Sequence, residues 1–81
     1  MDREMLRQVV LETLTTIAPE VEPASLRDDM ALRDQVDLDS MDWLNFLVRL
    51  HERLQVDIPE ADYRQLSTLD RLLCYLAKKL A

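Results

Sequence analysis

The sequence predicts an all-α fold: a small four-helix bundle of three main helices and one short helix, with a long loop between the first and second helices. Three observations lead to this prediction. Apolar residues recur at helical spacing in three segments, no segment alternates with period two for long enough to form a strand, and prolines or capping residues separate the segments. At 81 residues the chain has room for one core, so we expect a single domain over residues 1–81.

The first helix is predicted over residues 3–18, because its apolar residues repeat every three or four positions and Pro19 then stops the pattern. Residues 19–39 follow as a long connection, in which the sequence allows one helical turn over residues 25–30. A connection of about 20 residues is unusual in a small domain and is commonly functional or anchored by its own side chains.

The second helix is predicted to begin at Asp39 or Ser40 and to end near Leu54, with Asp39 able to cap its first turn. A short third helix is predicted from Pro59, which suits a first helical position, to about residue 66. Ser67 then resembles the N-cap of a last helix. The buried stripe of that helix is predicted to be Leu69, Leu72, Leu73, Leu76 and Leu80.

The second helix has more apolar surface than one core face requires. The residues that suffice for that face are Trp43, Phe46, Leu47, Leu50 and Leu54. Met41, Leu44 and Val48 widen the apolar arc by about a third of a turn. A central helix could bury this wider arc. Alternatively, these three residues are exposed and form a docking surface for partners.

The formal net charge of −6 is concentrated in one segment. Residues 20–42 contain eight acids and two arginines, whereas the rest of the chain contains eight acids and eight bases. This balance argues against nucleic acid as a partner. The absence of glycine excludes a glycine-rich phosphate-binding loop, and one cysteine with one histidine excludes both an internal disulfide and a closed zinc site.

No catalytic residue and no metal site is predicted. Asp37, Asp39 and Asp42 invite a calcium-loop interpretation, but that loop requires an oxygen ligand, a glycine and a glutamate where Met41, Asp42 and Val48 stand. No apolar run is long enough to span a membrane, and the first residues lack the pattern of a signal peptide. We therefore expect a cytoplasmic protein, and a monomer.

The segment Asp37-Leu38-Asp39-Ser40-Met41-Asp42 can be explained as a capped helix start. Its context adds a long acidic loop before it, an amphipathic helix after it, the segment Val56-Asp57-Ile58-Pro59-Glu60, a short helix, and a final helix introduced by Ser67-Thr68. With this context, nearly the whole chain resembles the acyl carrier protein family.

The resemblance implies that a phosphopantetheinyl transferase attaches 4′-phosphopantetheine to Ser40, with Asp39 and Met41 matching the family's flanking residues. The arm would carry acyl groups as thioesters and present them to acyl-loading and acyl-transferring enzymes, so the chain itself is expected not to be an enzyme. Fatty-acid, polyketide and related pathways all use such carriers. The residues expected to contact partners are Asp37, Met41, Asp42, Leu44, Val48 and Glu52.

Two departures from the family favour a specialised pathway: Asp37 replaces a frequent glycine, and Arg49 and Arg53 dilute the acidity of the second helix. Two alternatives to a discrete acyl carrier stay open. One is a peptidyl or aminoacyl carrier. The other is an unmodified helical adaptor that docks partners through Met41, Leu44 and Val48.

Overall fold

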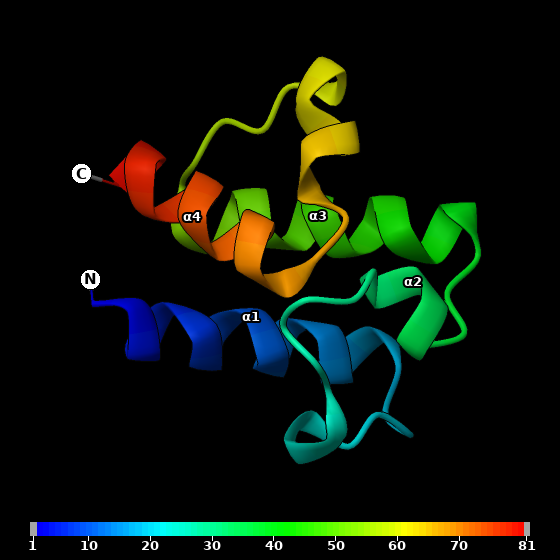
Figure 1. Cartoon of the computed structure of the whole chain (residues 1–81). Helices are drawn as coiled ribbons and strands as arrows, with labels where there is room; N and C mark the ends of the chain where they lie inside the picture. The colour runs from blue at the N-terminus through cyan, green and yellow to red at the C-terminus, as the bar shows by residue number, and fades with distance from the viewer. Residues whose placement is uncertain (1, 81) are drawn as a thin grey trace.

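The computed structural model describes residues 2–80 (Figure 1). Its elements are α1 (Arg3–Ile17), the 3-10 helix η1 (Pro23–Ser25), α2 (Leu32–Gln35), α3 (Ser40–Leu54), the 3-10 helix η2 (Glu60–Leu66) and α4 (Leu69–Leu80). Over these residues there is no strand, only an isolated antiparallel bridge between Ala31 and Thr68. The predicted all-α class and the long connection between the first two main helices are therefore confirmed.

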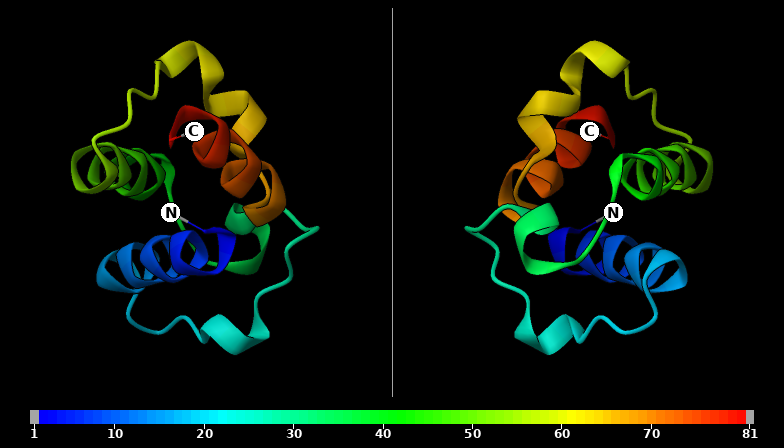
Figure 2. Two further views of the ribbon diagram at one scale, coloured as in Figure 1. Left: turned by 90° about the vertical axis from the view of Figure 1, so that its left-hand side faces the viewer. Right: turned by 90° about the vertical axis from the view of Figure 1, so that its right-hand side faces the viewer.

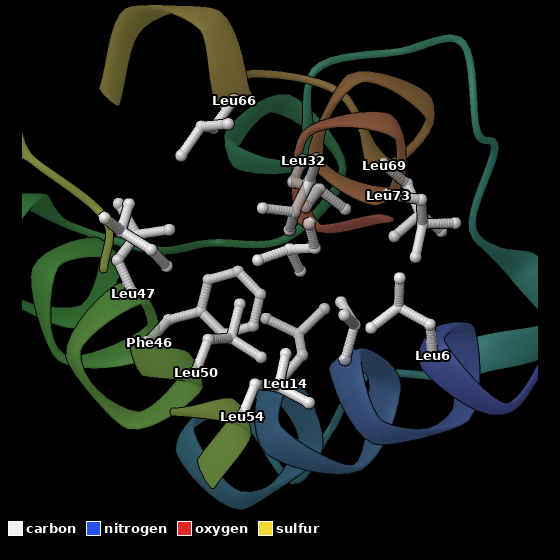
Figure 3. Packing of buried hydrophobic residues seen from close by; sticks show 14 of the residues in the cluster. Leu6, Leu14, Leu32, Phe46, Leu47, Leu50, Leu54, Leu66, Leu69 and Leu73 are labelled. Atoms are coloured by element: carbon white, nitrogen blue, oxygen red, sulfur yellow. The ribbon is translucent and has the colours of Figure 1, made fainter. Parts of the chain in front are cut away.

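The three long helices enclose a common interior. α1 packs against both α3 and α4, while η2 packs against α4. In the end-on views of Figure 2, α1, α3 and α4 form the corners of a triangle, with η2 on the outside of α4. Leucines and one phenylalanine fill the space between them (Figure 3). The largest fully buried side chains include Leu6, Leu14, Phe46, Leu50 and Leu73.

Local caps set the ends of α1 and α3. The carboxylate of Asp2 accepts a hydrogen bond from the Met5 N–H at 2.8 Å, so α1 begins one residue after an N-cap. α3 ends at Gln55, which has a φ of 56° and so adopts the left-handed conformation that glycine usually supplies at this position. The Gln55 side chain offsets part of this cost by donating to the Glu52 carbonyl at 2.7 Å.

The helical turn predicted over residues 25–30 is wrong. The helical segments of this connection are η1, which ends at Ser25, and α2, which begins at Leu32. The side chain of Gln35 explains the difference, because it accepts from the Arg27 N–H at 2.6 Å and donates to the carbonyls of Arg27 and Met30. These bonds satisfy the N–H and carbonyl of Arg27 and the carbonyl of Met30 without helical hydrogen bonds. Leu32 in α2 is fully buried and anchors the connection to the core.

The N-cap predicted at Ser67 is also wrong by one residue. The Thr68 hydroxyl accepts the hydrogen bond from the Arg71 N–H at 3.1 Å and caps α4. Ser67 instead ends η2 in a helical conformation, and its carbonyl accepts from the Leu32 N–H at 2.8 Å. The predicted leucine stripe of α4 is buried except for Leu80, which is partly buried at its end.

A hydrogen bond between Tyr75 and Asp62 fastens η2 to α4. The Tyr75 hydroxyl donates to the Asp62 carboxylate at 2.6 Å. Partial burial, followed by this hydrogen bond to a negative acceptor, raises the pKa of Tyr75 to about 12. Because the folded-state pKa exceeds the unfolded value of 10.0, the tyrosine's contribution to stability is full below pH 10 and is lost as the pH rises toward 12.

We therefore expect Tyr75→Phe to lower the free energy of unfolding by about 1 kcal/mol near neutral pH. The difference between the variant and the wild type should shrink above about pH 10, because only the wild type then loses the neutral hydroxyl on which the bond depends. Urea denaturation at a series of pH values measures both quantities. A difference that stays constant up to about pH 11.5 would contradict this role for Tyr75.

Candidate functional site

Ser40 is the first residue of α3 and is exposed. The preceding Asp39 has an extended backbone, and its carboxylate accepts from the Asp42 N–H at 2.8 Å, as the sequence predicts for a cap. The N–H groups of Ser40 and Met41 have no intrahelical acceptor, because the first turn of a helix provides none. The Ser40 hydroxyl therefore lies beside backbone donors at the positive end of the α3 dipole.

The chain turns into α3 without a glycine. The Leu38 N–H donates to the Val36 carbonyl at 2.8 Å, which makes a three-residue turn centred on Asp37. Asp37 does not have a positive φ, so this is an inverse γ-turn that any residue can adopt. Val36 and Leu38 are buried and the intervening Asp37 is exposed. Alternate burial of these side chains thus positions Ser40 although Asp37 stands where the family often has a glycine.

Met41, Leu44 and Val48 form an exposed apolar stripe along α3. Their exposed fractions are 65%, 39% and 40%, so the alternative in which α3 buries its wider apolar arc is wrong. The opposite face of α3, which includes Phe46 and Leu50, is fully buried. The exposed stripe begins beside Ser40 and has the spacing of a docking surface.

The acids nearest to Ser40 make no ion pair within residues 2–80. Asp28 is paired with Arg7 at 2.6 Å and Asp29 with Arg27 at 3.0 Å, both away from α3. The Arg27 hydrogen bond and charge lower the pKa of the Asp29 carboxyl. The acids around Ser40 are Asp37 and Asp39, which are exposed, and Asp42, which is half-buried. Their charge is therefore available to a basic partner.

Glu52 lies apart from the other predicted partner residues. It is exposed on the same stripe as Leu44 and Val48, but it is three turns beyond Ser40, about 18 Å along α3. The neighbouring Arg53 bonds Glu12 of α1 at 2.6 Å. The structure thus brings together the predicted residues at the start of α3 and leaves Glu52 at the far end of the stripe.

A groove beside the start of α3 was not predicted from the sequence. It has a volume of about 310 Å³. Its lining residues are Ala31, Arg33, Trp43, Tyr63, Arg64 and Ser67. Trp43 was assigned to the core, but it is only partly buried, and its ring packs on Phe46 with centroids 5.4 Å apart. The remaining lining residues lie in or directly beside α2 and η2, and no spacing in the sequence connects those segments to Trp43.

The sequence over residues 6–76 matches the family described as "Phosphopantetheine attachment site". The chain belongs to this family. A domain of this family implies enzymes that modify and use it, and the predicted resemblance to acyl carrier proteins is confirmed at the level of family and fold.

Among solved structures, the acyl carrier protein from Enterococcus faecalis, described for the contribution of novel structural components to its high thermal stability, has the same fold. The TM-score is 0.74 at 20% sequence identity, and the alignment covers 98% of this chain and 99% of that protein. A comparison with curated protein sequences gave no significant match. Across residues 2–80, no helix is long and apolar enough to cross a membrane.

Asp39→Ala should lower the free energy of unfolding by about 1 kcal/mol, because the Asp42 N–H loses its acceptor and the start of α3 loses a favourable charge. Asp39→Asn should retain most of the stability, since an amide oxygen also caps. Urea denaturation measures these differences. Asp37→Ala is the matched control, because Asp37 is also exposed and acidic but makes no cap, and equal losses in the two alanine variants would refute the assignment.

Proposed function

We propose that this chain is a carrier domain whose Ser40 bears 4′-phosphopantetheine and presents acyl groups, held as thioesters on the arm, to partner enzymes. The family match over residues 6–76 is the observation that carries the proposal. Attachment requires an accessible serine hydroxyl, and Ser40 is exposed. The sequence has three serines, Ser25, Ser40 and Ser67. Of these, only Ser40 begins a long helix, where backbone N–H groups and the helix dipole stabilise an anionic phosphodiester.

The proposed modification needs no base in this chain. The Ser40 oxygen attacks the phosphorus of coenzyme A that carries the pantetheine, and a new P–O bond forms. The bond from that phosphorus to the nucleotide breaks, adenosine bisphosphate leaves, and the transferase accepts the serine proton. The carrier contributes an exposed hydroxyl and a surface that the transferase can bind, which fits a role as substrate and carrier rather than catalyst.

Incubation with a broad-specificity phosphopantetheinyl transferase and coenzyme A should add the mass of one phosphopantetheine to the protein. Intact-mass spectrometry measures the gain. Ser40→Ala should abolish it, whereas Ser25→Ala and Ser67→Ala should retain it. The proposal fails if the wild type gains no mass beside a competent acyl carrier protein, or if the gain survives in the Ser40→Ala variant.

The exposed stripe of Met41, Leu44 and Val48 is proposed to receive the transferase and the acyl-transferring enzymes. The acids at Asp37 and Asp42 lie beside the stripe and would attract a basic partner surface. Fatty-acid, polyketide and peptidyl carriers all need a surface that their enzymes can bind. The pathway therefore depends on which loading enzyme recognises the stripe. An unmodified adaptor is the second candidate, because an exposed apolar stripe can dock partners without any arm.

Leu44→Ser and Val48→Ser should each lower kcat/KM of the transferase about five- to tenfold, as truncation of a central apolar contact does. Their effect on stability should be small, because both side chains are already exposed in the free protein. Met5→Ser on α1 is the matched control, since Met5 is 56% exposed and distant in sequence from Ser40. Unchanged kcat/KM in both stripe variants would remove the stripe from transferase binding.

A further inference from the structure

The groove formed by Ala31, Arg33, Trp43, Tyr63, Arg64 and Ser67, hereafter the Trp43 groove, carries positively charged side chains although it adjoins the acidic segment 20–42. Two of its lining residues are arginines and none is an acid. Arg33 belongs to α2 and Arg64 to η2. The arginines therefore come from different walls of one groove.

Arg33 and Arg64 have no carboxylate partner within residues 2–80. Four other arginines do have one, including Arg7 with Asp28 and Arg53 with Glu12. A guanidinium group binds carboxylates and phosphates through parallel N–H donors, so two unpaired arginines on one groove favour an anionic ligand.

The walls between the arginines are aromatic and held in place. Trp43 and Tyr63 are both partly buried against the core, and the Trp43 ring also packs on Phe46. The Ala31–Thr68 bridge and the bond from the Leu32 N–H to the Ser67 carbonyl join the start of α2 to the end of η2. The groove thus offers apolar contact for a hydrocarbon chain. Backbone hydrogen bonds hold together the two segments that carry its arginines.

The Trp43 groove is also close to Ser40. Trp43 follows Ser40 by three residues on α3, which is about 4.5 Å along the axis and about 60° around it. A group tethered to Ser40 therefore has a high effective concentration at the groove, so contacts that are weak in solution can hold it there.

We propose that the Trp43 groove binds the carried acyl group, and that it selects acyl groups that end in a carboxylate. This inference rests on the proposed function of Ser40. The acyl chain lies against Trp43 and Tyr63, and Arg33 and Arg64 bind the terminal carboxylate. The phosphodiester of the arm is also an anion that the arginines could bind. A form of the protein with the arm but no acyl group distinguishes it from the acyl carboxylate.

The test compares three forms of the protein, made with the transferase from coenzyme A, pentanoyl-coenzyme A and glutaryl-coenzyme A. The two acyl groups have equal chain length and differ in a terminal methyl or carboxylate. Trp43 is the only tryptophan, so its indole N–H resonance in a ¹H–¹⁵N spectrum reports on the groove without ambiguity. The glutaryl form should shift this resonance most, and its thioester should react with hydroxylamine roughly fivefold more slowly than the pentanoyl thioester.

Arg33→Gln and Arg64→Gln should remove the difference between the glutaryl and pentanoyl forms, and both residues are exposed, so the variants should fold. Arg71→Gln, a change at an exposed arginine of α4 outside the groove, should keep the difference. Equal Trp43 shifts and equal hydroxylamine rates in the glutaryl and pentanoyl forms would overturn the inference. An arginine-dependent Trp43 shift in the form without an acyl group, as large as that in the glutaryl form, would also overturn it, because the arginines would then bind the phosphodiester. If intact mass shows no loading at Ser40, the proposed function fails and the inference fails with it.

Discussion

The burial of one face of α3 is the constraint on which the rest of this structure depends. Phe46 and Leu50 are fully buried between α1 and α4, and they fix the rotation of α3 about its own axis. With 3.6 residues per turn, that rotation leaves Leu44 and Val48 at the surface and Trp43 at the edge of the core. The same packing of α3 therefore creates both the exposed stripe and one wall of the groove.

The long connection before α3 solves a second problem, which is to reach the start of that helix without glycine. Buried side chains do this in place of special backbone angles: Leu32, Val36 and Leu38 enter the core at intervals along the segment. The Gln35 side chain satisfies backbone groups of Arg27 and Met30, ahead of these anchors. Because the anchors are apolar and the exposed positions between them are free, acids such as Asp37 can be placed beside Ser40 at little cost in stability.

Sequence reasoning predicted the parts of this fold that depend on local chemistry. The long helices and the Asp39 cap follow from periodicity and capping rules, which act over a few residues, whereas periodicity left open whether Met41 is buried or exposed. It failed at the turn over residues 25–30 and at the cap of α4, because those depend on hydrogen bonds between the connection and the η2–α4 junction. The groove was missed for the same reason: the bonds from Ala31 and Leu32 to Thr68 and Ser67 join the segments that carry Arg33 and Arg64.

The two charged features around Ser40 act over different distances. The acids at the start of α3 are exposed, so they attract a basic partner through solvent, and salt at physiological concentration screens such attraction beyond about 8 Å. The arginines of the groove act by contact, next to aromatic walls that exclude part of the solvent, and salt weakens contact pairs less. Raising the salt should therefore slow the approach of partner enzymes before it releases a carboxylate from the groove. A carrier built this way separates recognition of the enzyme from retention of the cargo, although both features lie beside the start of α3.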